Sequence, residues 1–385
     1  MSQPVTYTFR TAGAIVTGRN SLQTLTDYLP AGAKHALIIS QSVLKSMVEE
    51  TQALLKAKGV SSDVYLDIEP EPPVEHLEEV HAKLANEKYD VYIGLGGGSV
   101  LDSVKILAVM ATTGLSVRDM LNGKPITKPG IPMILIPTTS GTGSEVTPNA
   151  IVTIPEEELK VGIVSPYFLP KVALLDPMLT LSLPKPVTAA TGMDAFTHAI
   201  ESYISNKANA LSDMFALEAI RLISRSLVTA YSEGDNIQAR EDMLIGSMYG
   251  GMALTAAGTA AVHALAYPLG GKYKIAHGVS NAMLLPHVMR FNKDACKERL
   301  RVAAEAMGIE VKHLGASEAA DQAIERMEEW VRQVHIPQDL GAYGVTADDL
   351  DDLAVAASKV TRLLNNNPKP LSLDDMKAIY AKLLK

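Results

Sequence analysis

The first half of the chain alternates short apolar runs with segments in which apolar residues recur at helical spacing. The apolar runs predict buried strands at residues 35–40, 64–68, 89–95 and 131–136. Helical patterns follow the first three runs, at residues 41–58, 74–88 and 100–110. Repeated alternation of strand and helix is typical of a parallel sheet with helices on both faces, so we expect a Rossmann-like α/β domain.

From residue 187 onward the pattern changes to long helical stretches without a convincing strand. The clearest of these stretches cover residues 188–205, 210–231, 237–254 and 260–269. A segment with two prolines, residues 179–186, separates the two halves and is interpreted as a hinge. We therefore expect a nucleotide-binding α/β domain over residues 1–185 and an all-helical, metal-binding domain over residues 186–385.

Composition narrows the class of protein. A chain of 385 residues exceeds the roughly 250–300 residues that one core usually supports, which agrees with two domains. The net charge of −8 gives no electrostatic basis for binding nucleic acid or an anionic membrane. No apolar run approaches the roughly 18 residues of a membrane helix, and the first residues do not resemble an export signal. Cys296 is the only cysteine, so we expect a soluble protein of the reducing cytoplasm.

A glycine-rich segment lies directly between a predicted strand and a predicted helix. Residues 94–99 read Gly-Leu-Gly-Gly-Gly-Ser, in which Ser99 replaces the last glycine of the usual dinucleotide fingerprint. Glycines let the backbone approach a pyrophosphate, and the N-terminus of the following helix attracts its charge. A tight turn is the alternative, but consecutive glycines cost backbone entropy, so we favour phosphate binding.

A second candidate loop, residues 137–145, reads PTTSGTGSE and follows the strand predicted at 131–136. Both loops would lie at the carboxyl ends of parallel strands, where open α/β sheets bind ligands. Its five hydroxyl side chains, Ser144 included, could surround a nucleotide ribose and diphosphate. A solvated loop is the alternative, because serine, threonine and glycine are common in loops.

Four side chains of the second half could hold a metal ion. Asp194 and His198 are four residues apart in a helical stretch and therefore lie on one face. His263 lies in an apolar helical stretch, where an unpaired imidazole is costly to bury, and His277 lies in a loop-like segment. Three imidazoles and one carboxylate suit Fe²⁺ or Zn²⁺. Spacing alone leaves open that these are ordinary core and surface residues.

Five segments together resemble the iron-containing, group III alcohol dehydrogenases. The matching segments occur in a fixed order along nearly the whole chain and are GGGS-x-x-D-x-x-K (96–105), PTTSGTGSE (137–145), TGMDAFTHAIE (191–201), VHALAYPLGG (262–271) and AHGVSNAMLLPHVMRFN (276–292). The resemblance implies an N-terminal nucleotide-binding domain, a helical metal domain and an active site in the cleft between them.

The resemblance also implies roles for individual residues. The implied metal ligands are Asp194, His198, His263 and His277. The residues implied to bind NAD or NADP are Gly97, Gly98 and Ser99 at the pyrophosphate, Thr138 and Thr139 at the adenosine half, Lys160 at the ribose, and Asp102 near the same loop.

Three positions depart from the family pattern. Gln41 stands where members often carry an aspartate that binds the adenosine ribose diol, and it does not repel a 2′-phosphate as a carboxylate would. Glu71 stands where many members have asparagine and could bind the diol instead, so NAD and NADP both remain open. Tyr267 replaces a histidine that is a candidate proton relay in several relatives, and a phenol with a pKa near ~10 is a poorer base. Tyr267 and His277 are the candidate catalytic side chains.

The predicted function is an NAD(P)-dependent, Fe²⁺-dependent dehydrogenase of small primary alcohols or diols that also reduces aldehydes, with Zn²⁺ as the other candidate metal. In this interpretation the metal polarises the alcohol oxygen while hydride passes to the nicotinamide. The alternative is a lyase like dehydroquinate synthase, which needs clustered basic residues, and Lys272 and Lys274 are the only close pair in the metal segments. A non-catalytic binding protein is a third possibility. A homodimer is expected from base rates alone.

Overall fold

The computed structural model describes residues 6–157 and 159–385 and divides the chain into two compact units. One unit is Thr11–Leu183, and the other combines the segment that ends at Arg10 with Pro184–Lys385. The chain therefore passes from one unit to the other twice, after Arg10 and after Leu183.

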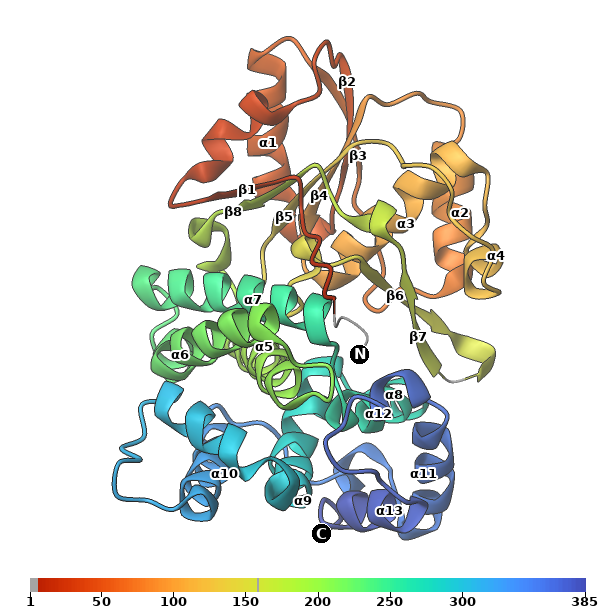
Figure 1. Cartoon of the computed structure of the whole chain (residues 1–385). Helices are drawn as coiled ribbons and strands as arrows, with labels where there is room; N and C mark the ends of the chain where they lie inside the picture. Colours follow the sequence, from red (N-terminus) through yellow and green to blue (C-terminus); the bar gives the residue numbers. More distant parts are fainter. Residues whose placement is uncertain (1–5, 158) are drawn as a thin grey trace. The chain divides into compact units, whose positions relative to one another are not determined.

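A six-stranded sheet forms the centre of the unit Thr11–Leu183, with every pair of neighbouring strands parallel (Figure 1). The strand order across the sheet is β1-β8-β5-β4-β2-β3. The strands are β1 (Ala14–Thr17), β2 (His35–Ile39), β3 (Ser61–Tyr65), β4 (Val91–Gly96), β5 (Met133–Pro137) and β8 (Val172–Leu175). A separate antiparallel pair is formed by β6 (Asn149–Ile154) and β7 (Leu159–Val164).

Helices cover both faces of this sheet because side chains alternate along each strand. Ile38 and Ile93 pack in a core with α1, whereas Leu37 and Leu135 pack in a second core with α2 and α3. The helices of this unit are α1 (Lys45–Ala57), α2 (Val74–Leu84), α3 (Gly98–Thr113) and α4 (Val117–Leu121). The carboxyl ends of β4 and β5 lead directly into the two loops that the sequence singles out.

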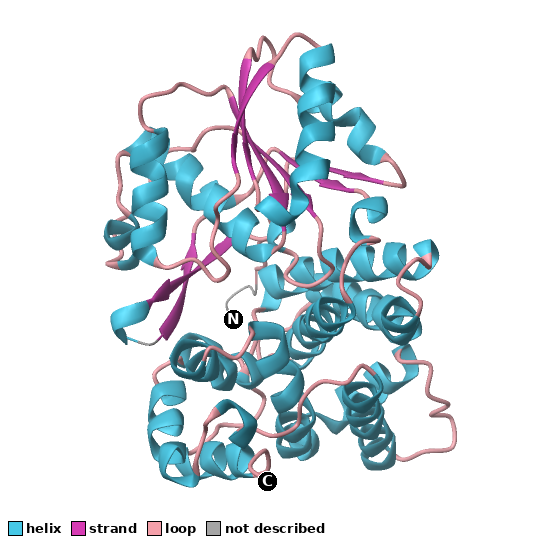
Figure 2. Cartoon of the chain, turned by 180° about the vertical axis from the view of Figure 1, so that it is seen from behind, coloured by secondary structure: helices cyan, strands magenta, loops and turns pink. Residues whose placement is uncertain are grey.

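The other unit is built from helices, and its described residues contain no strand (Figure 2). Its helices are α5 (Lys185–Ile204), α6 (Ala210–Ser232), α7 (Ile237–Ala257), α8 (Ala261–Tyr273), α9 (His277–Ala306), α10 (Ala316–Gln333), α11 (Leu350–Ser358), α12 (Thr361–Leu364) and α13 (Leu373–Ala381). Within the described ranges no single helix is long and apolar enough to cross a membrane; α7 and α8 pass that test only as a pair bent by 106°.

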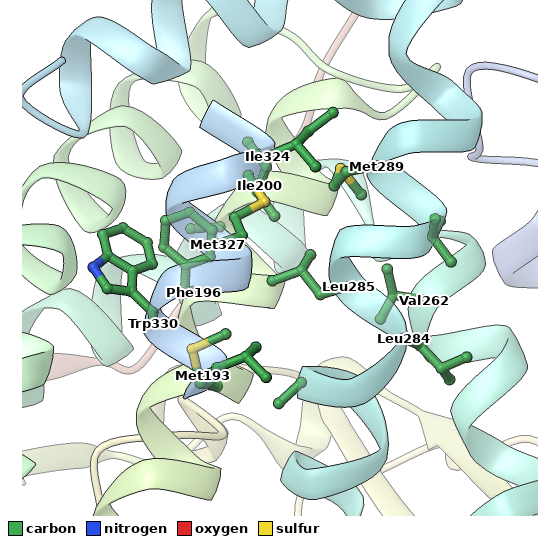
Figure 3. Close-up of a cluster of buried hydrophobic side chains, with 14 of the residues drawn as sticks. Met193, Phe196, Ile200, Val262, Leu284, Leu285, Met289, Ile324, Met327 and Trp330 are labelled. Atoms are coloured by element: carbon green, nitrogen blue, oxygen red, sulfur yellow. The ribbon is translucent and has the colours of Figure 1, made fainter. Parts of the chain in front are cut away.

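A continuous apolar core holds α5, α8, α9 and α10 together (Figure 3). Phe196 on α5 meets Trp330 on α10 edge-to-face, with ring centroids 5.1 Å apart, an arrangement that adds about 0.5–1.5 kcal/mol beyond area burial. Val262 on α8 and Leu285 on α9 belong to the same core. Packing of their apolar side chains in this core therefore fixes the helices that carry the predicted metal ligands.

The predicted fold class, a parallel Rossmann-like α/β part followed by an all-helical part, is confirmed. The bounds predicted for one strand are wrong: β3 begins at Ser61, because its register with β2 starts at the His35–Ser61 pair. Strands β1 and β8 and the β6–β7 pair were not predicted. Strands of four residues, such as β1 and β8, are too short for a period to be visible in the sequence.

Candidate metal centre and cofactor loops

Asp194 and His198 lie one turn apart on α5, and both side chains are buried. Nε2 of His198 is 3.9 Å from Oδ1 of Asp194. Residues Met193 to Ile204 of α5 are all buried, so these polar side chains are surrounded by protein and need partners there. The spacing of four residues brings the two groups together as the sequence predicts.

Two further histidines approach the same carboxylate from other helices. His263 is the third residue of α8, and its Nε2 is 3.7 Å from Oδ1 of Asp194. His277 is the first residue of α9 rather than part of a loop, and its Nε2 is 3.8 Å from that oxygen. One ligand atom each from Asp194, His263 and His277 lie within 4.8 Å of one another. His198, the fourth predicted ligand, is not part of this group of three; its ring stacks on that of His263, with centroids 4.7 Å apart.

The electrostatics of this cluster favour an ionised Asp194. Burial by itself raises the pKa of this carboxyl, but the neighbouring histidines and the Asn281 amide act in the opposite direction and outweigh burial, so its pKa lies below the ordinary value. A charged carboxylate surrounded by imidazoles is the donor set that a divalent metal ion uses. Only His277 is appreciably exposed, with 28% of its side chain accessible.

Asn281 provides a test of whether these residues fit a cation. Its Nδ2 lies 2.7 Å from Oδ1 of Asp194 and 3.2 Å from Nε2 of both His263 and His277. An amide nitrogen has two hydrogens, so it cannot satisfy three acceptors at once. The acceptor atoms of three helices therefore converge on one region, and a single cation would satisfy all of them. The residues present fit a divalent metal ion.

Glu201 was not identified from the sequence as part of the site. It lies on α5 three residues after His198, and its side chain is fully buried. Its Oε2 is 2.7 Å from Nδ1 of His263, on the side of the imidazole ring opposite to Asp194. The pattern His-x-x-Glu within one helix was a signal for such a residue, but its partner lies 62 positions further along the chain.

Tyr267, the candidate proton relay, lies one turn after His263 on α8. Its ring centroid is 6.0 Å from that of His277, and the residue is 6% exposed. The phenol is therefore beside the most exposed of the four predicted metal ligands.

The glycine-rich segment forms the junction between β4 and α3. Gly97 is the N-cap of α3, and no side chain caps this end of the helix. Uncapped N–H groups at a helix N-terminus are a site where an anionic group binds. The glycines also let the two loops approach each other: a Cβ on Gly97 would lie 3.2 Å from Cγ2 of Thr139, and one on Gly98 would lie 2.6 Å from Cγ2 of Thr142.

The second loop is tied to α3 by Asp102. One carboxylate oxygen of Asp102 accepts a hydrogen bond of 2.5 Å from Oγ of Ser144, and the other accepts one from the backbone N–H of Ile151. The backbone N–H of Thr138 donates to the carbonyl of Gly96 and links the first loop to the start of the second. The structure thus brings together the predicted residues of both loops.

Gln41 follows β2, Glu71 lies in the segment between β3 and α2, and Lys160 is the second residue of β7. The backbone N–H of Glu71 donates to Oγ of Ser99, and its carboxylate forms an ion pair of 2.6 Å with the buried Lys160. The Gln41 side chain donates from Nε2 to the carbonyl of Ile68 at 2.9 Å. Glu71 and Lys160 are therefore coupled to each other, whereas the amide of Gln41 is oriented by the backbone.

Two buried charged groups near these loops were not predicted. Burial raises the pKa of Glu145 to about 7, and its Oε1 has no hydrogen-bond partner among the described residues. Burial lowers the pKa of Lys105, although Asp102 opposes this shift. Nζ of Lys105 donates to the carbonyl of Asn149 at 2.7 Å. Glu145 is the last residue of the PTTSGTGSE segment, so the second loop itself contains a carboxyl group with a raised pKa.

The chain combines a parallel α/β unit with a helical unit that contains a carboxylate–histidine cluster, an arrangement that suits a metal-dependent dehydrogenase. Sequence comparison identifies the family: the profile of the iron-containing alcohol dehydrogenases matches residues 12–177, and the C-terminal profile of the Fe-containing alcohol dehydrogenase family matches residues 188–384. The chain belongs to the iron-containing alcohol dehydrogenase family and is an oxidoreductase. The predicted family is confirmed, and nothing in the comparisons supports the lyase alternative.

Several relatives match over most of their length. The chain is 46% identical to long-chain-alcohol dehydrogenase 1 of Geobacillus thermodenitrificans (strain NG80-2), over 91% of this chain and 89% of that protein. It is 37% identical to the 1,3-propanediol dehydrogenase of Klebsiella pneumoniae, over 91% of both. A crystal structure of a 1,3-propanediol oxidoreductase aligns with a TM-score of 0.94 at 35% identity, covering 99% of this chain and all of that one.

Proposed function

We propose that this protein interconverts small primary alcohols or diols and the corresponding aldehydes, with NAD or NADP as the hydride carrier and Fe²⁺ as the metal. The observation that carries the proposal is the convergence of Asp194 Oδ1 with Nε2 of His263 and His277, beside His198. Zn²⁺ suits the same ligands and is the second candidate metal.

Asp194, His198, His263 and His277 would hold the metal, which when bound acts as a Lewis acid toward the oxygen of the substrate. The protein's own contribution is to keep these four side chains in place before any ligand arrives. Burial of three of them excludes competing water, and the carboxylate reduces the positive charge of the site. The partial exposure of His277 supports substrate entry from its side.

The cofactor is assigned to the edge of the sheet where β4 and β5 end. Gly97, Gly98 and Ser99 at the uncapped start of α3 would bind the pyrophosphate. Thr138, Thr139 and the loop fixed by the Asp102–Ser144 hydrogen bond would border the adenosine half. On this basis residues 1–185 act as the nucleotide-binding domain and residues 186–385 as the metal-binding domain.

Cofactor preference depends on the charges beside the ribose. Lys160 would reach the ribose, and its ion pair with Glu71 leaves a carboxylate in the same neighbourhood. A carboxylate can accept hydrogen bonds from a ribose diol and repels a 2′-phosphate. This arrangement favours NAD over NADP, with Gln41 as a neutral neighbour.

His277 and Tyr267 are the candidates for proton transfer. The proximity of the Tyr267 ring to His277 supports a phenol that donates a hydrogen bond near the reacting oxygen. Aldehyde reduction consumes a proton, so a donor at this position suits that direction of the reaction.

The names of the relatives span long-chain alcohols and 1,3-propanediol. We place this chain with enzymes of small alcohols and diols, and a panel of aldehydes of increasing length tests that choice. We further propose that the protein is cytoplasmic and forms a homodimer. Light scattering coupled to size-exclusion chromatography tests the second.

The experiment for the proposed activity is anaerobic purification with added Fe²⁺, followed by absorbance of reduced nicotinamide. NADH and NADPH are each tested against C2–C4 and longer aldehydes. We expect turnover with at least one C2–C4 aldehyde. Absence of turnover with every aldehyde would reject the proposal, and turnover of a phosphorylated heptulosonate alone would favour the lyase.

A further inference from the structure

Glu201 is a buried carboxylate whose two oxygens lie beside two backbone N–H groups and the Nδ1 atom of His263. Oε1 accepts the backbone N–H of Val262 at 2.6 Å, and Oε2 accepts the backbone N–H of Ala260 at 3.0 Å. Nδ1 of His263 is 2.7 Å from Oε2. Burying a carboxylate is costly unless hydrogen bonds compensate it, so these contacts account for its presence in an apolar core.

We propose that Glu201 is a positioning residue of the metal centre, which fixes His263 in the tautomer and orientation that a metal requires. The inference rests on the proposed function, because it assumes that His263 is a ligand. An ionised carboxylate has no proton to donate, so Nδ1 of His263 must carry the hydrogen of this bond. The ring then has its lone pair on Nε2, which is the atom that faces Asp194.

Glu201 also fixes the backbone that carries His263. Helix α8 begins at Ala261, and its N-cap residue Ala260 has no side chain that can accept a hydrogen bond. The carboxylate from α5 takes over this role and meets the positive end of the helix dipole. Val262, whose N–H bonds to Glu201, has its side chain in the apolar core (Figure 3). One side chain therefore sets both the start of α8 and the rotation of the His263 ring.

The variant Glu201→Gln separates this role from simple packing, because glutamine has the same size but only one acceptor oxygen. If that oxygen faces His263 and Ala260, the NH₂ group opposes the N–H of Val262. If the amide is turned, its NH₂ donates to Nδ1 of His263 and moves the ring proton to Nε2, where it blocks the lone pair. Neither orientation preserves all three hydrogen bonds.

The test is a titration of the metal-depleted, full-length protein with Co²⁺, whose visible absorption reports its ligand set. We expect the wild-type protein to bind one Co²⁺ per chain and Glu201→Gln to bind it about 10–100-fold more weakly. Asp242→Asn is the matched control, because Asp242 is a buried carboxylate that contacts Arg225 and Ser226 and no predicted ligand. This control should lose thermal stability and keep its Co²⁺ affinity.

Wild-type affinity in Glu201→Gln, within threefold, would overturn the positioning role while leaving the metal site intact. Absence of Co²⁺ binding to the wild-type protein would instead reject the proposed metal site, and with it this inference. If Glu201→Gln does not fold, Glu201→Asp replaces it. The shorter carboxylate keeps its charge but cannot reach all three donors, so at least tenfold weaker binding is expected and unchanged binding would contradict the inference.

Discussion

The side-chain amide of Asn281 donates to the carboxylate of Asp194 over 2.7 Å, although 87 positions separate the two residues in sequence. The same amide nitrogen lies 3.2 Å from Nε2 of His263 and of His277. Asn281 thus contacts the acceptors that a metal ion would bind, and it is itself one helical turn after His277. Its two hydrogens are well placed as donors to the buried acceptors Oδ1 of Asp194 and Nε2 of His263.

Replacing Asn281 by alanine should therefore destabilise the metal-free protein more than the metal-bound protein. Leaving buried acceptors without a donor costs about 1–3 kcal/mol, and a bound cation restores their partner. Thermal unfolding in a chelator and in saturating Co²⁺ measures the difference. Asn292→Ala is the control, since Asn292 forms a buried amide pair with Asn367 and should lose the same stability under both conditions. If Asn281→Ala loses the same thermal stability in chelator and in saturating Co²⁺, this account is contradicted.

Replacing Gly98 by alanine should weaken the start of α3 and cofactor binding. The new Cβ would lie 2.6 Å from Cγ2 of Thr142, and overpacking of this kind costs about 1–3 kcal/mol. Urea unfolding and the Kd for NADH measure the two effects. Adding Thr142→Ser removes the methyl group and should restore part of both. If Gly98→Ala alone keeps wild-type stability and wild-type affinity for NADH, the structure of the two loops does not depend on this close approach.

Replacing Glu71 by glutamine should shift cofactor preference toward NADP. The change removes the negative charge next to Lys160 and with it the repulsion of a 2′-phosphate. We expect the ratio of kcat/KM for NADPH to that for NADH to rise by about tenfold or more. Glu69→Gln, an exposed change in the same segment, serves as the control. An unchanged ratio would mean that Glu71 does not face the ribose.

Glu145 should make the stability of the protein depend on pH. Its folded-state pKa of about 7 lies above the ordinary glutamate value of 4.5, so between these two pH values the folded state holds a proton that the unfolded state has released. Stability from this group is therefore full below about pH 4.5 and is lost as pH rises toward 7. Glu145→Gln should match the wild-type protein near pH 4.5 and exceed it by roughly 3 kcal/mol above pH 8. Urea unfolding at both pH values measures the two free energies of unfolding. A difference between variant and wild type that does not change with pH would contradict the prediction.

The part of the fold that the sequence predicts well is the part with long periodic segments. Buried strands such as β2 and β4 consist mostly of apolar runs, and the long helix α6 contains neither glycine nor proline. The four-residue strands β1 and β8 were missed because their pairing depends on each other and not on local pattern. Residues 6–10 fall with the helical unit, and only tertiary contacts decide this.

The candidate site divides in the same way. Asp194 and His198 could be paired from their spacing within one helix. The roles of Glu201 and Asn281 could not be predicted from the sequence, because each role depends on a contact between two helices that lie far apart in sequence. Glycines 97 and 98 were interpreted as room for a phosphate, whereas the structure adds a second reason, the close approach of Thr139 and Thr142.

Anomalous diffraction at the iron absorption edge, from crystals of the anaerobically reconstituted protein, tests the central claim most directly. We expect one dominant peak about 2.0–2.3 Å from Oδ1 of Asp194 and from Nε2 of His198, His263 and His277, and its loss in His263→Ala. A dominant peak elsewhere, or one that touches fewer than three of these four side chains, would contradict the account.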